Sequence, residues 1–172
     1  MLPRSADRAA QEGPVRAPVQ AWLFPATYMA HIAEELWAGE GFPSWASRHT
    51  GLGFTPQRFL ALNGVVLLVM IVCAALATRR PSLRWLLPAL AAAVTLNGLA
   101  HIAASLVTRS YSPGLLSGTL LWVPLGIATL IRCSHSLSRR ELLGGVAAGL
   151  AAHAIITLCA VAISSVARAS AG

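Results

Sequence analysis

Residues 59–78 read FLALNGVVLLVMIVCAALAT, a run with no charged side chain and a single amide, that of Asn63. A helix needs roughly 20 apolar residues to cross the hydrocarbon core of a bilayer, and this run has that length. Three further apolar runs follow it along the chain, at 85–107, 115–131 and 142–166. The sequence therefore predicts an all-α integral membrane protein, a bundle of transmembrane helices.

The composition supports this class. The chain has 172 residues, of which 56% are hydrophobic and only 11% charged, against about 25% charged in ordinary soluble domains. Its net charge of +7 comes from thirteen arginines without any lysine. We expect these arginines to contact membrane lipids, because they cluster in short connections and form no continuous basic face for nucleic acid. Three cysteines without a CxxC pair predict neither a disulfide framework nor a zinc ribbon.

A fifth helix is expected ahead of these four. The segment 19–38 is long enough to span, and Trp22 and Trp37 flank it as interfacial anchors. Pro25 marks either the start of this helix or a kink near it. Inside the segment lie four polar side chains, those of Tyr28, His31, Glu34 and Glu35. The predicted bundle thus has about five transmembrane helices, at 19–38, 59–78, 85–107, 115–131 and 142–166.

The remaining segments follow from this count. Residues 1–17 are expected to form a disordered cytoplasmic tail without a signal peptide, and 18–167 a single bundle domain. The connection 39–58 is expected to be an irregular outer loop, either a lid over a site or an interfacial loop anchored by Trp45 and Phe54. With five spans, nine arginines fall on one side and four on the other. This bias predicts a multi-pass protein of the cell membrane, with a cytoplasmic N-terminus and an external C-terminus.

The polar side chains of the first helix point to function. A charge near the bilayer centre costs about 2.5–3.5 kcal/mol on insertion scales, so such residues usually face the protein interior. His31, Glu34 and Glu35 cover one side of a helix, and His101 and His153 fall at a similar depth in other spans. Adjacent carboxylates in low dielectric repel each other, so either a proton or a divalent metal must neutralise the pair.

The predicted site follows from these residue types. Imidazole and carboxylate are ligands of zinc and of non-haem iron, so His31, Glu35, His101 and His153 are the candidate ligands of one divalent metal ion, iron or zinc. Glu34 is left free as the candidate catalytic base or as a group that supports the ligands. Pocket support is expected from Tyr28, Asn63 and Asn97. The histidines at 49 and 135 are expected to be loop residues without a site role.

A family resemblance rests on several of these residues. His31-Ile32-Ala33-Glu34-Glu35 resembles the motif that names the HXXEE domain family of small multi-pass membrane proteins. The further histidine of that family matches His101, with His153 as a rival, and its Tyr-x-Pro-Gly motif matches Tyr111-Ser112-Pro113-Gly114. The resemblance covers roughly residues 20–165 and implies four membrane helices, one fewer than expected here. It implies a fold and a site, but no reaction.

The Tyr-x-Pro-Gly segment has its own physical reading. Proline followed by glycine favours a type II turn. Tyr111, beside that turn, is a second catalytic candidate, as a hydrogen-bond donor or acid, and its alternative is an interfacial tyrosine. The ridge made by Gly145 and Gly149 allows close helix contact and could serve an oligomer.

Three functional hypotheses remain open. The first is a small membrane metalloenzyme acting on a lipid-like or apolar small molecule, by oxidation with iron or by hydrolysis or isomerisation with zinc. The second is a metal-free isomerase or cyclase that uses Glu34 and Glu35 as acid and base. The third is a non-catalytic protein that binds haem, carries protons or serves as a subunit of a complex.

Overall fold

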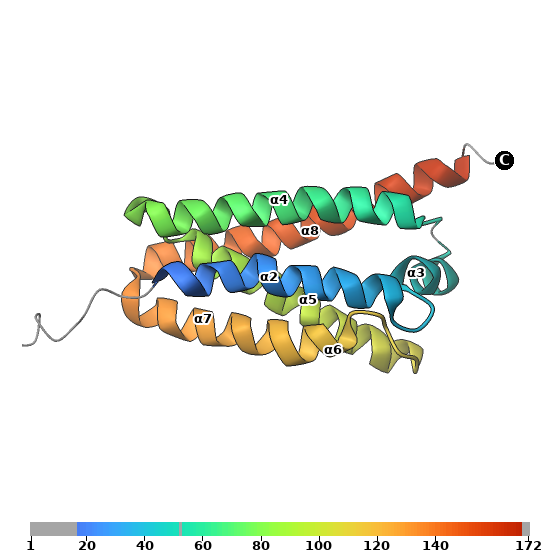
Figure 1. Cartoon of the computed structure of the whole chain (residues 1–172), viewed down its shortest axis with the longest axis horizontal. Coiled ribbons are helices and arrows are strands. Elements are labelled where there is room, and N and C mark those ends of the chain that lie inside the picture. The colour runs from blue at the N-terminus through green and yellow to red at the C-terminus, as the bar shows by residue number, and fades with distance from the viewer. Residues whose placement is uncertain (1–16, 52, 170–172) are drawn as a thin grey trace, which may run out of the picture.

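The computed structural model of the chain describes residues 17–51 and 53–169, and all regular structure in these ranges is helical (Figure 1). The tail expected at 1–17 lies outside the described residues except for Ala17, the first residue of a helix. Five long helices run side by side along the long axis of the molecule, and consecutive ones point in opposite directions. They are α2 (Ala17–Trp37), α4 (Pro56–Arg79), α5 (Leu86–Thr108), α7 (Val123–Ser136) and α8 (Arg139–Ala169).

Four segments are long and apolar enough to cross a membrane: Pro56–Arg79, Pro81–Thr108, Leu115–Ser136 and Arg139–Ser165. The third of these consists of α6 (Leu115–Ser117), a π-helical turn η2 (Gly118–Trp122) and α7. The second includes the short 3-10 turn η1 (Pro81–Leu83) before α5. These four segments coincide with the four apolar runs of the sequence, which confirms an all-helical membrane bundle.

Helix α2 completes the five. It is not among the four apolar spans, because its 21 residues include the polar side chains of His31, Glu34 and Glu35. It nevertheless packs along α4 and extends over most of the bundle's length (Figure 1). The helix begins at Ala17 and continues through Pro25, which is buried inside it. The expectation that Pro25 marks the start of this helix is therefore wrong.

The connection between α2 and α4 is more regular than expected. It contains α3 (Phe42–Thr50), a nine-residue helix with proline in its first turn and Gly51 at its C-terminal end in the left-handed conformation, φ 67°. Because Pro43 suits a first helical turn and glycine tolerates positive φ, both boundaries are encoded locally. Figure 1 shows α3 at the end of the bundle where α2 ends and α4 begins. The segment thus caps that end of the molecule.

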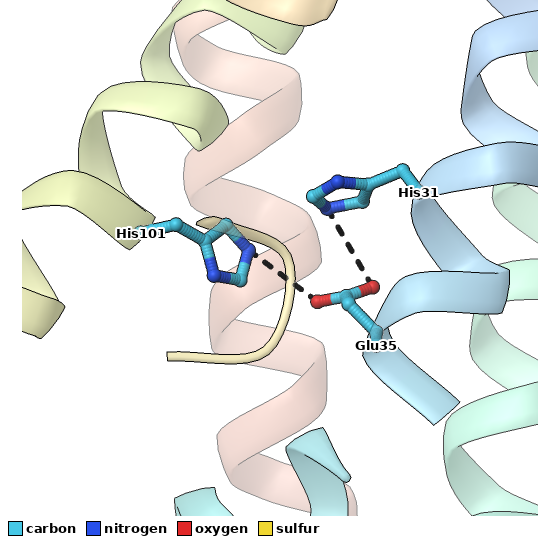
Figure 2. Close-up of side chains that lie close together, drawn as sticks. All are labelled: His31, Glu35 and His101. Atoms are coloured by element: carbon cyan, nitrogen blue, oxygen red, sulfur yellow. Dashed lines mark ion pairs between the residues drawn. The ribbon is translucent and has the colours of Figure 1, made fainter. Parts of the chain in front are cut away.

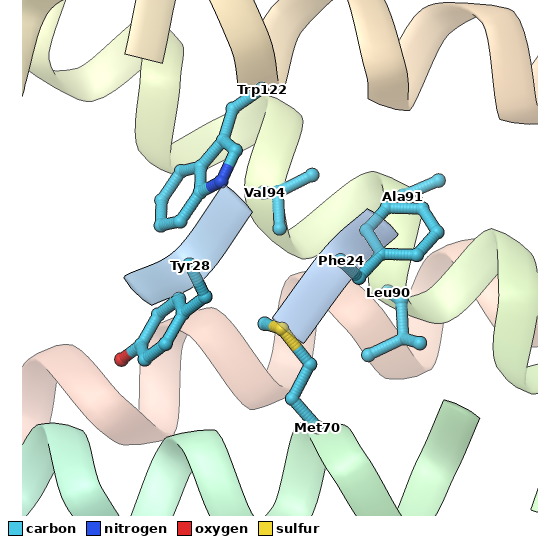
Figure 3. Close-up of a cluster of buried hydrophobic side chains, with 7 residues drawn as sticks. All are labelled: Phe24, Tyr28, Met70, Leu90, Ala91, Val94 and Trp122. Carbon is cyan, nitrogen blue, oxygen red and sulfur yellow. The ribbon is translucent and has the colours of Figure 1, made fainter. Parts of the chain in front are cut away.

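The hydrophobic core lies between α2, α4, α5 and the η2 turn (Figure 3). Tyr28 stacks on Trp122, with ring centroids 5.6 Å apart, and Phe24 is fully buried. This packing anchors α2 in the bundle despite its polar residues, because burying large aromatic side chains stabilises each by a few kcal/mol. The core side chains are Phe24, Tyr28, Met70, Leu90, Ala91, Val94 and Trp122.

The glycine ridge of α8 is used within the chain. Gly145 and Gly149 are buried, and a Cβ atom at either position would collide with backbone carbonyls of the segment that opens α5, those of Trp85 and Ala89. The small side chains thus let α8 approach α5 closely. This contact sets the register between the two helices.

Candidate metal centre

Two imidazoles and one carboxylate converge inside the bundle (Figure 2). The Nε2 atom of His31 lies 3.6 Å from one oxygen of Glu35, and Nε2 of His101 lies 3.4 Å from the other oxygen. All three side chains are buried, with His31 fully inaccessible. His31 and Glu35 come from successive turns of α2 and His101 comes from α5, so the fold brings together residues 66 or more positions apart, as expected from the sequence.

The other ring nitrogen of each histidine is fixed by a serine. His31 Nδ1 lies 2.7 Å from Ser117 Oγ, and His101 Nδ1 lies 3.0 Å from Ser112 Oγ. When each Nδ1–H donates to its serine oxygen, each Nε2 presents a lone pair towards Glu35. Metal-binding histidines are commonly oriented in this way, by a hydrogen bond at the nitrogen that does not bind the metal.

The Nε2 atom of His31 is buried without a hydrogen-bond partner. Its ring stacks on that of Trp122, with ring centroids 3.7 Å apart, and meets the ring of His101 edge-on, with centroids 5.0 Å apart. An unpaired buried polar atom costs about 1–3 kcal/mol, so it calls for a partner that protein groups do not supply. A cation between the two imidazoles and the carboxylate would satisfy it.

The spacing of the three groups is compatible with one bound metal ion. One ligand atom from each of His31, Glu35 and His101 lies within 4.8 Å of the other two. The distances of 3.4 and 3.6 Å join the two Nε2 atoms to different oxygens of Glu35, and they place both imidazoles beside this one carboxylate. They are longer than an ordinary hydrogen bond of about 2.7–3.2 Å.

The Tyr-x-Pro-Gly segment builds the wall beside His101. The amide of Leu115 donates to the carbonyl of Ser112, and Gly114 has φ 102° and ψ −8°, which confirms the expected type II turn. A Cβ atom on Gly114 would lie 2.6 Å from the ring of His101. Only glycine therefore allows the backbone to pass this close to the imidazole. Pro113, the second residue of this turn, is fully buried.

The η2 turn brings two further groups to His31. Ser117 immediately precedes η2 and Trp122 ends it, and both contact the His31 ring. Residues five apart on a regular α-helix differ by about 140° around the axis, whereas a π-helical turn bonds residues five apart and aligns them. The wider turn thus places a hydrogen-bonding group and an aromatic face on the same side. Such turns are frequent at functional sites.

Glu34 lies outside the group formed by His31, Glu35 and His101. Its carboxylate accepts hydrogen bonds from the backbone amides of Gly114, Leu116 and Ser117 and from the hydroxyl of Tyr111. These amides are the unpaired donors at the start of the α6–η2–α7 segment, where a negative charge is favourable. Glu34 therefore connects α2 to the segment from Ser112 to Ser117, whereas its neighbour Glu35 faces the two imidazoles.

Tyr111 lies at the edge of this contact, 37% exposed. Burial and the nearby carboxylate of Glu34 raise the pKa of its phenol above the usual value, so the hydroxyl stays protonated and donates. Its ring packs against Gly39 at the end of α2. The three residues His31, Glu35 and His101 are called the triad below. Tyr111, a catalytic candidate, lies outside this triad and donates a hydrogen bond to Glu34.

A cavity of about 190 Å³ adjoins the triad. Glu35 and His101 line its wall, and Phe42 of α3 closes one side, with its ring 5.7 Å from that of His101. The indole of Trp45 donates a hydrogen bond from Nε1 to Ser110 Oγ, which holds α3 beside this wall of the cavity. The pocket-support candidates Tyr28, Asn63 and Asn97 also line the cavity, and so does His153.

His153 is the one metal-ligand candidate that the structure does not add to the triad. Among the described residues, the group that can hold a metal consists of His31, Glu35 and His101 alone. His153 reaches the same cavity from α8. Of the support residues, Tyr28 donates to Asn63, at 2.6 Å, and the Asn63 amide donates to the carbonyl of Phe59.

The sequence reasoning missed three groups that shape the centre, namely Ser112, Ser117 and Trp122. Ser112 is the variable position of the Tyr-x-Pro-Gly motif, so its place next to a conformationally special turn was a usable signal. For Ser117 and Trp122 the signal is absent, because their alignment depends on the π-helical turn.

Fold and centre together define a small multi-pass helical membrane protein with a buried group of two histidines and one glutamate. The family described as "Protein of unknown function with HXXEE motif" matches residues 22–129, well over half of the chain. The protein belongs to this HXXEE family. Comparisons with curated proteins and with solved structures give no match. The matched range contains all three residues of the triad and both serines.

Proposed function

We propose that this protein is a membrane metalloenzyme that binds one divalent metal ion through His31, Glu35 and His101. One observation carries the proposal: two serine-oriented imidazoles face a single buried carboxylate, and one Nε2 has no protein partner. Three protein ligands leave coordination positions for substrate or water, as in catalytic rather than structural metal sites. The adjoining cavity supplies the space for a substrate.

The cavity indicates an apolar substrate. Its lining is dominated by carbon, from side chains such as Leu62, Val66, Met70 and Ile156, and it lies within the membrane-spanning part of the bundle. A lipid-like or other apolar small molecule can reach such a pocket from the bilayer, whereas a strongly charged metabolite cannot be desolvated there at low cost.

The chemistry depends on the metal. Two histidines and one carboxylate with open positions are the ligand set of non-haem iron oxygenases, and the same set binds catalytic zinc. Zinc-dependent hydrolysis usually needs a base beside the metal-bound water. Glu34 does not supply this base, because its carboxylate accepts hydrogen bonds from three backbone amides. The geometry therefore supports oxygen-dependent oxidation with iron(II) better than hydrolysis.

The metal-free alternative has less support. An isomerase or cyclase using Glu34 and Glu35 as an acid–base pair needs both carboxyl groups at the substrate. Only Glu35 lines the cavity, while Glu34 bonds to the turn at 114–117. Haem binding would require the two imidazoles on opposite faces of a porphyrin, yet their rings lie 5.0 Å apart with a carboxylate between them.

We further propose that the protein lies in the cell membrane with its N-terminus in the cytoplasm. The turns 79–84 and 132–140 carry six arginines and lie together at the end of the bundle where α2 begins (Figure 1). An excess of arginine in short loops marks the cytoplasmic side. Helix α3 and the Tyr-x-Pro-Gly turn then face outward, and α8 ends on the outer side.

Elemental analysis tests the metal proposal. The protein is purified in detergent without chelators, under reducing conditions, and its metal content is compared with that of Glu35→Ala and of His135→Ala. His135 is an exposed histidine at the far end of α7 and serves as the matched control. We expect close to one metal ion per chain in the wild type and in His135→Ala, and almost none in Glu35→Ala. A wild type that stays metal-free after incubation with iron(II) or zinc contradicts the proposal.

A further inference from the structure

Two polar side chains in the cavity have no hydrogen-bond partner within the described part of the chain. Asn97 of α5 and His153 of α8 both line the cavity, and neither side chain bonds to another protein group. Asn63, in the same wall, accepts a hydrogen bond from Tyr28 and donates one to the Phe59 carbonyl. Both side chains are half-buried, so their polar groups are open to the cavity, where a bound ligand can pair with them.

Their position relates them to the triad. Asn97 precedes His101 by four residues, so it lies one helical turn, about 6 Å, further along α5. His153 comes from α8, which lies directly against α5 through the close contact at Gly145 and Gly149. Both groups therefore face the cavity beside the metal centre without being part of it.

The cavity encloses only part of a lipid-sized molecule. Its volume of about 190 Å³ is slightly larger than that of an engineered apolar cavity of about 150 Å³ that holds benzene. The lining residues on α4 and α8 are partly exposed, among them Val66, Ile156 and Thr157. Helices α4 and α8 have few contacts with each other, although Arg58 donates to the carbonyl of Ile163 near their outer ends. The remainder of a longer substrate can pass between them into the bilayer.

We propose that Asn97 and His153 form a polar subsite that binds the hydroxyl group of an apolar alcohol, with the reacting carbon about one helical turn away at the triad. A hydroxyl both donates and accepts a hydrogen bond, and so do a carboxamide and a neutral imidazole. The apolar part of the molecule occupies the rest of the cavity and leaves between α4 and α8. This inference deepens the proposed enzymatic function and rests on it.

Photolabelling tests the subsite. The protein, in lipid nanodiscs, is exposed to a long-chain primary alcohol carrying a diazirine and to a diazirine alkane of the same length, and labelled residues are quantified by mass spectrometry. We expect the alcohol to label cavity residues about fivefold more than the alkane, the factor of one net hydrogen bond. Asn97→Leu and His153→Phe should remove this preference, whereas His153→Gln and the control His135→Phe should retain it.

Metal content is measured on the same samples. A failure of the polar subsite can then be distinguished from a failure of the proposed metalloenzyme function. Equal cavity labelling by both probes in metal-loaded wild type overturns the polar subsite and leaves the metal centre intact. A preference that survives in both Asn97→Leu and His153→Phe also overturns it. Wild type that prefers the alcohol but binds no metal overturns the proposed enzymatic function and not the subsite. Metal retained by Asn97→Leu and His153→Phe shows that these variants are folded.

Discussion

Glu34 and Glu35 are neighbours in α2, yet their carboxylates serve different parts of the molecule. Glu35 faces the two imidazoles at 3.4 and 3.6 Å, while Glu34 accepts hydrogen bonds from three backbone amides and a tyrosine hydroxyl. Successive residues of an α-helix are about 100° apart around its axis. Glu34 and Glu35 can therefore contact two different elements, the segment 114–117 and helix α5. The motif thus places one carboxylate against the two imidazoles and the adjacent one against the backbone of residues 114–117.

Replacing Glu34 by glutamine should weaken the contact between α2 and the backbone amides of residues 114–117. The amide group would place N–H donors opposite backbone donors, and hydrogen bonds to a charged group are worth about 1.5–3 kcal/mol. We expect Glu34→Gln to lower the free energy of unfolding by about 1–3 kcal/mol, measured as a lower Tm in detergent. Glu40→Gln is the control, because Glu40 is exposed and pairs with Arg48 at the surface. Equal Tm values for the wild type and Glu34→Gln would show that the contact does not stabilise the fold.

The contact of Tyr111 with Glu34 should depend on pH. The pKa of this phenol is raised above its usual value of 10.0. Its stabilising contribution is therefore fully present below pH 10 and is lost as the pH rises from there towards the raised pKa. The difference in Tm between the wild type and Tyr111→Phe should be constant from pH 6 to 9 and shrink above pH 10. A difference that grows at alkaline pH would contradict this assignment.

Much of the fold follows from hydropathy. The apolar runs at 59–78 and 85–107 lie within α4 (Pro56–Arg79) and the span Pro81–Thr108, because length and apolarity alone decide a membrane helix. Helix α3 was missed, since nine mixed residues give no periodic signal, although its proline and terminal glycine are local markers. The passage of α2 through Pro25 depends on tertiary packing, which a single sequence does not reveal.

The convergence of His31, Glu35 and His101 was predictable from the sequence, but the residues that support them were not. Histidines and acids inside apolar runs are so costly that His31, Glu35 and His101 stand out in the sequence. The separate direction of Glu34 follows from helix geometry, yet the partner that it reaches depends on where the turn at 111–114 folds. Ser117 carries no such signal, because serine is common in membrane helices and loops, whereas Ser112 is marked only by its place in the Tyr-x-Pro-Gly motif.

Gly114 should not tolerate a side chain. It has φ 102°, and a Cβ atom there would lie 2.6 Å from the His101 ring. Positive φ costs a residue other than glycine about 1–3 kcal/mol, and the collision would also displace the imidazole. Gly114→Ala should therefore lower both Tm and metal content. Gly64→Ala and Gly144→Ala are matched controls, because nothing lies within 4 Å of a Cβ at either position. Metal content unchanged in Gly114→Ala would contradict the role of this turn.

The two serines should tune metal affinity without being ligands. Loss of a hydrogen bond to a metal-binding histidine typically weakens metal binding by 10–100-fold. We expect Ser112→Ala and Ser117→Ala each to show a weaker affinity in this range, measured by competition with a chelating indicator, while the stoichiometry stays at one. Ser134→Ala, at an exposed position of α7, should leave the affinity unchanged. Wild-type affinity in both site variants would show that the rings are held by packing alone.

The most direct measurement is an optical titration with cobalt(II), whose absorption reports the geometry and ligands of the metal. The account predicts visible bands that saturate at one cobalt ion per chain in the wild type and in His153→Gln. The same bands should be absent from His31→Ala, Glu35→Ala and His101→Ala. No visible bands in the wild type, or identical bands in the wild type and His101→Ala, would contradict a metal centre at these three residues.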